Sequence, residues 1–145
     1  MKNLASILLL GLISLSMNAQ KIIEKNIDYE SQFIDVDVKF ANLIEVKTWD
    51  KSTVYFKASI YTEDLKFQDL FKINIDENSS SINIESEAEP VFKAYRKDCL
   101  KNNPENKRYC YYTGDLIKFN YVIYVPKNAR FKISSINGDL KSEVI

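Results

Sequence analysis

Most of the chain alternates apolar and polar residues, and this period of two is typical of β-strands with one buried face. The first three strands that the pattern predicts lie at 34–40, 44–48 and 54–60. The turn-like segment Trp49–Thr53 separates the second strand from the third, so we expect these two to form a hairpin. Alternation resumes at 71–75, where Asn78-Ser79-Ser80 turns the chain into 82–84 as a second hairpin.

Two further strands follow near the C-terminus. The first, 119–125, ends at Pro126, which has no amide proton to donate to a ladder. The second, 131–135, runs into Asn137-Gly138-Asp139 and then into 140–145. Because glycine adopts a positive φ without steric cost, this corner suits either a tight hairpin or a turn of a β-solenoid.

The alternation breaks between residues 88 and 115. This segment has more basic than acidic residues and contains both cysteines of the chain and a cluster of tyrosines. It is interpreted as a long surface loop inserted between two strands, and such insertions often carry function. Elsewhere only 63–70 has helical spacing, over a stretch short enough for a single turn or a loop. We therefore expect an all-β fold in which antiparallel hairpins lead into a short β-solenoid-like end, with one insertion at 88–115.

Residues 1–19 have the organisation of a secretory signal peptide. Lys2 precedes an apolar run over 4–15, and Met17-Asn18-Ala19 places a small residue before Gln20. This pattern predicts cleavage between Ala19 and Gln20. The apolar run is shorter than the roughly 20 residues of a membrane-spanning helix, and no cysteine follows it for lipid attachment. We expect export without stable membrane insertion, with 20–145 forming a single β-domain in the periplasm, at the cell surface or outside the cell.

Composition narrows the chemistry. The chain has 20 basic residues, 20 acidic residues and no histidine. Balanced charge gives no electrostatic reason to expect nucleic acid as a partner. The lack of histidine excludes Ser-His and Cys-His catalysis and histidine-containing zinc sites. We therefore predict neither an enzyme nor a cofactor. A carboxylate-only enzyme is the alternative, but Glu85, Glu87 and Glu89 recur at period two, which is more typical of a solvated strand edge than of a glycosidase pair.

Both cysteines, Cys99 and Cys110, lie in the insertion. In an exported chain they are expected to form a disulfide that closes this segment. The alternatives are a two-thiolate metal site and free or intermolecular thiols. Carboxylates at Asp35, Asp37 and Asp50 have the chemistry of calcium ligands. The first two lie on the polar face of a strand, where solvated charge is the rule, and the chain has no calcium-loop motif. We predict no metal site.

Aromatic and arginine side chains provide the candidate binding residues, because both types concentrate at interfaces. The insertion contributes Arg96, Arg108, Tyr109, Tyr111 and Tyr112. Trp49, together with Tyr55, is a second candidate at the tip of the first predicted hairpin. Either set has the chemistry to stack on sugar rings or to anchor a protein partner. The alternative is that some members pack inward while the others flank the sheet.

Residues 121–144 resemble a known family. They read Tyr-Val-Ile-Tyr-Val-Pro-Lys, then four residues, then Lys-Ile-Ser-Ser-Ile-Asn-Gly-Asp-Leu. A strand that ends in Val-Pro, followed by a strand that runs into an Asn-Gly-Asp corner, is similar to the adhesin family of exported bacterial β-domains, close to the head-GIN adhesin domains. Residues 44–58, with Trp49-Asp50 at the tip, resemble the opening hairpin of that family, and 71–85 resemble its middle hairpin.

The resemblance implies a β-sandwich-like start that passes into a right-handed β-solenoid, with a surface or adhesion role. The expected function is therefore a non-catalytic adhesin-like domain that binds a protein or glycan at the cell envelope. The alternative is a structural or accessory envelope component that assembles through an open C-terminal strand edge. In that case 131–135 and 140–145 form a first turn of the solenoid that no further turn covers, and Val144 and Ile145 are left without protection against strand pairing. This end would then meet a second copy or another envelope protein.

Overall fold

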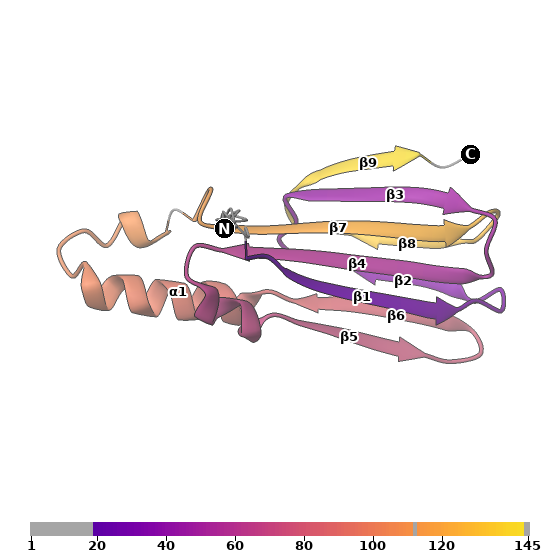
Figure 1. The fold of residues 1–145 in the computed structure, drawn as a ribbon, viewed down its shortest axis with the longest axis horizontal. Helices are drawn as coiled ribbons and strands as arrows, with labels where there is room; N and C mark the ends of the chain where they lie inside the picture. The colour runs from indigo at the N-terminus through magenta and orange to yellow at the C-terminus, as the bar shows by residue number, and fades with distance from the viewer. Residues whose placement is uncertain (1–18, 112, 144–145) are drawn as a thin grey trace, which may run out of the picture.

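The computed structural model describes residues 19–111 and 113–143. The predicted signal peptide, apart from Ala19, lies outside the described residues, as do Tyr112, Val144 and Ile145. Figure 1 shows two β-sheets lying one behind the other, with a helix projecting beyond one end of the strands. The inner faces of both sheets contribute to one hydrophobic cluster, so the sheets form the two layers of a single core.

Both sheets are mixed, with antiparallel and parallel pairs. The front sheet has five strands in the spatial order β1 (Lys21–Asp28), β4 (Thr53–Thr62), β7 (Ile117–Pro126), β3 (Leu43–Trp49) and β9 (Asp139–Glu143). The rear sheet has four strands in the order β5 (Lys72–Glu77), β6 (Ser81–Glu87), β2 (Phe33–Asp37) and β8 (Phe131–Ser134). The pairs β1–β4, β4–β7 and β5–β6 are antiparallel, whereas β2 and β3 pair only in parallel with their neighbours.

The period-two pattern explains the core. In β4 every second side chain is buried, beginning with Val54 and Phe56, while Tyr55 and Lys57 lie on the outer face. β7 behaves in the same way and buries Tyr121 almost completely. Each fully buried side chain of this size contributes about 1.5–3 kcal/mol relative to an exposed one. The all-β prediction is therefore confirmed.

The first predicted hairpin is wrong. Trp49–Thr53 does connect β3 to β4, but β7 lies between these two strands and pairs with both. The alternation of β3 and β4 specifies which side chains face the core, and it is equally satisfied when a third strand separates them. The second predicted hairpin is confirmed as β5–β6. The segment with helical spacing forms the short 3₁₀ helix η1 (Leu65–Leu70), and β7 ends at Pro126 as expected.

The insertion is only partly a loop. Its first half is the helix α1 (Glu89–Asn102), and a 3₁₀ turn η2 (Tyr109–Tyr111) follows. Pro90 occupies the first turn, where its missing amide proton costs nothing. Val91, Tyr95 and Cys99 recur every four residues, and this stripe of the helix is its more buried side. The loop was expected because the period-two alternation breaks here, and that reasoning overlooked this short stripe.

The strands β8 and β9 lie in parallel on β2 and β3. Ile34 pairs with Phe131 in the rear sheet, and Leu43 pairs with Asp139 in the front sheet. The Asn137-Gly138 corner therefore joins strands of different sheets and is not a hairpin. Gly138 has a φ of +124°, and a Cβ there would lie 2.2 Å from the carbonyl oxygen of Ala41. Glycine is thus required where this corner stacks on the corner between β2 and β3.

Candidate binding cleft

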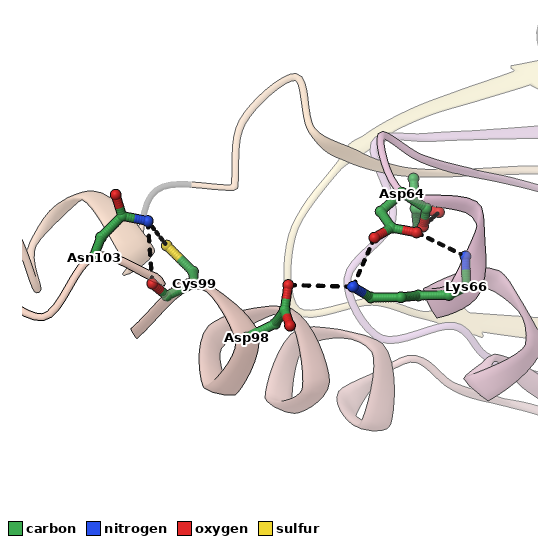
Figure 2. Close-up of polar contacts among 6 residues, drawn as sticks. Asp64, Lys66, Asp98, Cys99 and Asn103 are labelled. Atoms are coloured by element: carbon green, nitrogen blue, oxygen red, sulfur yellow. Dashed lines mark hydrogen bonds and ion pairs between the residues drawn. The ribbon is translucent and has the colours of Figure 1, made fainter. Parts of the chain in front are cut away.

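Lys66 connects the insertion to the two-sheet body of the protein through ion pairs (Figure 2). The ammonium group of Lys66 in η1 lies 2.7 Å from the carboxylate of Asp64 and 3.3 Å from that of Asp98 in α1. These side-chain hydrogen bonds lower the pKa of Asp64 and raise the pKa of Lys66. The groups are exposed, so the bridge orients α1 more than it stabilises the fold.

A disulfide links the two halves of the insertion. Cys99 in α1 bonds Cys110 in η2, with both residues buried, which confirms the predicted pairing. Asn103, at the end of α1, donates a backbone hydrogen bond to the carbonyl oxygen of Cys99, and its side-chain amide donates a second one to the same oxygen (Figure 2). The disulfide therefore fixes η2 against the last turns of α1.

The same disulfide places a tyrosine over an arginine. Arg96 lies one helical turn before Cys99, and Tyr111 directly follows Cys110. The central carbon of the Arg96 guanidinium lies 4.4 Å from the centre of the Tyr111 ring, within the range of a cation–π contact. Two of the residues predicted to bind are thus brought together by a covalent link next to them.

A cleft of about 490 Å³ lies beside this pair. It is bounded by α1, the corner between β2 and β3, residues 111 and 113–114, and the corner between β8 and β9. Its lining includes Phe40, Asn42, Phe92, Arg96, Tyr111 and Asn137. The volume falls in the range of about 300–1,000 Å³ that is typical of small-molecule sites.

The wall of the cleft is fixed to the core. The rings of Phe40 and Phe92 meet edge to face at 5.1 Å, and Phe92 meets Phe119 at 5.6 Å. Phe40 has a φ of +60°, an uncommon conformation for a bulky residue that only a well-determined environment maintains. The side-chain oxygen of Asn42 accepts the Phe119 amide proton at 2.9 Å. The amide nitrogen of Asn42 makes no hydrogen bond to the described residues and can donate to a ligand.

Arg96 carries a charge that the described residues do not neutralise. Within residues 19–111 and 113–143 it has no ion pair, and its Nε is buried without a hydrogen-bond partner. The neighbouring cation, Lys93, lies 3.7 Å from Glu89 in an exposed pair. A positive charge is therefore left over in the cleft.

The other predicted binding residues lie elsewhere. Arg108 is exposed and Tyr109 lines a separate, smaller hollow on the other side of α1. Tyr112 is outside the described residues. Trp49 lies at the far end of β3, where its ring is 5.1 Å from that of Tyr124 and its indole nitrogen donates to the carbonyl oxygen of Thr53. Trp49 therefore packs against the turn between β3 and β4, away from the cleft, and its role in binding stays a prediction.

Some of the carboxylates singled out in the sequence, as calcium ligands or as a glycosidase pair, form ion pairs. Asp50 pairs with Lys127 at 2.8 Å, and Glu85 pairs with Lys39 at 3.7 Å. The described part of the chain has no group of three or more His, Cys, Asp or Glu side chains placed to hold a metal ion. The strongest pKa shifts also lie away from the cleft. Burial raises the pKa of Tyr121 to about 12, and a hydrogen bond to Glu24 raises that of Tyr55 to about 12.

Sequence reasoning selected only Arg96 and Tyr111 among the residues that line the cleft; those it missed include Phe40, Asn42, Phe92 and Asn137. Three of them lie on strand corners, where nothing in the alternation marks a side chain as functional. Phe92 would have been found by assigning 89–102 as a helix and examining its apolar side.

Comparisons with protein-family models, with curated proteins and with solved structures find no match to this chain. Of the helices in the described ranges, none has the length and apolar character needed to cross a membrane.

Proposed function

We propose that this protein is a non-catalytic, exported, adhesin-like domain that binds a protein or glycan at the cell envelope. The observation that carries the proposal is the cleft beside the stacked Arg96 and Tyr111. The signal-peptide pattern of residues 1–19 and the resemblance of 121–144 to the head-GIN adhesin domains support it. The disulfide supports it as well, because such bonds persist in oxidising compartments.

A binding role suits the rigidity of this site. The stack is held by a disulfide and by α1, and α1 in turn packs on the core through the contact of Phe92 with Phe119. A preformed site loses little conformational entropy when its ligand arrives, and more of the contact energy then appears as affinity. The chain has no histidine for acid–base work, and carboxylates do not gather in the cleft, which Glu89 alone reaches among the described acidic residues.

The test is a binding screen with two matched double variants. Purified protein is applied to a glycan array and to solubilised envelope proteins, alongside Arg96→Gln/Tyr111→Ala and Arg108→Gln/Tyr109→Ala. Both variants remove one arginine and one tyrosine from the insertion, but only the first pair lines the cleft. We expect binding to be lost only in the first variant. Equal binding by both variants would contradict the proposed site.

A second candidate function is structural. We propose that β8 and β9 form one turn of a solenoid stacked on β2 and β3. The open end of this turn would assemble with a second copy or another envelope protein. Leu140 pairs with the buried Ile44, yet it is 59% exposed, and Ile136 is 62% exposed. Leu140→Lys should abolish any concentration-dependent association seen by analytical ultracentrifugation. A wild-type protein that stays monomeric and gains no partner through this end would remove the candidate.

A further inference from the structure

We propose that the cleft at Arg96 binds a carboxylate-bearing sugar, such as a uronic or sialic acid unit of an envelope glycan. This inference rests on the proposed binding function and specifies its ligand. The cleft combines an arginine that has no ion-pair partner among the described residues, two phenylalanines and the side-chain amides of Asn42 and Asn137. Each of these features matches one part of an acidic sugar.

Arg96 would bind the carboxylate of the sugar. The planar guanidinium matches the geometry of a carboxylate and binds it through two parallel hydrogen bonds. Tyr111 covers one face of the guanidinium and orients its plane. Nε is already buried, so the terminal nitrogens are the part of this half-buried side chain that reaches a ligand. Lys93 adds a second positive charge at the rim, partly offset by Glu89.

The other residues that line the cleft would contact the sugar ring. Pockets for small ligands combine apolar and aromatic walls with a few placed polar groups. Phe40 and Phe92 provide the apolar wall, against which the C–H face of a sugar packs. The amide nitrogen of Asn42 donates to a ring hydroxyl, while the amide of Asn137 and the hydroxyl of Thr113 both donate and accept.

The surroundings favour a glycan over a peptide. An extended peptide usually adds to an exposed strand edge, where main-chain hydrogen bonds supply its affinity. The cleft is instead lined by corners, a helix and a loop, and its one strand residue, Ile117, belongs to β7 in the middle of the front sheet. No edge strand among the described residues therefore offers a ladder inside the cleft.

Isothermal titration calorimetry tests the assignment. Purified protein is titrated with galacturonic acid oligomers and sialyllactose, with the matching neutral galactose oligomers and lactose, and with a short peptide that has a free C-terminal carboxylate. We expect at least one acidic probe to bind at least tenfold more tightly than its neutral counterpart, and to weaken as salt is raised. Arg96→Gln should lower that affinity about 10- to 100-fold, the usual range for a charged hydrogen bond.

Two further variants serve as controls. Arg108→Gln removes an exposed arginine outside the cleft and should change the affinity less than about twofold. Arg96→Lys keeps the charge but loses the planar fork, so it should fall between wild type and Arg96→Gln. Circular dichroism of each variant checks that the strand content is retained.

Several outcomes would overturn the inference. Equal affinity for acidic and neutral probes, wild-type affinity in Arg96→Gln, or tighter binding of a peptide with a free C-terminal carboxylate each contradicts an acidic sugar. If no sugar binds but an envelope protein is captured and lost in Arg96→Gln, the ligand class is wrong and the binding function stands. If neither sugar nor protein binds through Arg96, both are wrong.

Discussion

Removing the disulfide separates the stability of the insertion from that of the two sheets. Neither Cys99 nor Cys110 belongs to the hydrophobic cluster between the sheets. The bond instead joins α1 to η2 and holds Tyr111 over Arg96. The double variant Cys99→Ala/Cys110→Ala should therefore weaken the protein without unfolding it, and should damage the cleft more than the core. Alanine is preferred to serine because both positions are buried.

The expected loss of stability follows from the length of chain that the bond closes. The cysteines lie 11 positions apart, and restricting a loop of this size in the unfolded chain is worth about 3 kcal/mol. The loss of affinity has a different origin, because Tyr111 would no longer be held at its place on the guanidinium. We expect it to match the loss caused by Tyr111→Ala.

Denaturant unfolding provides the measurement. Far-ultraviolet circular dichroism reports the strands, and the fluorescence of Trp49, the single tryptophan, reports the end of the sheets away from the insertion. The variant should unfold at lower denaturant, with both signals intact before the transition. A variant that is unfolded without denaturant would refute the separation of insertion and core. Full affinity in the variant would refute the role of the disulfide in positioning Tyr111.

Three other predictions follow from single positions. Gly138→Ala should destabilise the protein by at least about 2 kcal/mol, because the added methyl group meets the Ala41 carbonyl and the backbone has a positive φ; chemical denaturation measures this. Burial raises the pKa of Tyr121 to about 12, while an unfolded tyrosine titrates near pH 10. The unfolded state therefore loses its proton first, and stability should fall as the pH rises above about 10; Tyr121→Phe should reduce that fall, as measured by unfolding at pH 8 and pH 11. Export should remove residues 1–19, and the intact mass of the protein from the periplasm or medium should correspond to a chain that begins at Gln20; a mass that includes Met1 would contradict the signal peptide.

The alternation of residues predicts strand faces well and strand neighbours poorly. Val54 and Phe56 are buried, and Tyr55 lies outside, as the period of two requires. The same period carries no information on pairing, so nothing in 44–60 indicates that β7, some 60 residues later, lies between β3 and β4. β1 was missed altogether, because Ile22, Ile23 and Ile27 do not alternate with polar residues.

The candidate site was partly visible in the sequence. The sequence indicates Arg96 and Tyr111 because arginine and tyrosine are common at interfaces and because both lie in the insertion. It does not indicate Phe40 and Asn137, since they reach the cleft only through the stacking of one corner on another, at a sequence distance of almost a hundred residues. Long-range contacts of this kind depend on sheet topology, which a local pattern does not specify.

The location of bound ligand tests the proposed binding site most directly. Backbone amide chemical shifts of isotope-labelled protein, recorded with and without a ligand from the binding screen, map it residue by residue. We predict the largest changes around Phe40–Asn42, Arg96, Tyr111 and Asn137, all of which line the cleft. Changes concentrated at Trp49 and Tyr124, or along the exposed strand β9, with the cleft unaffected, would contradict the proposed site.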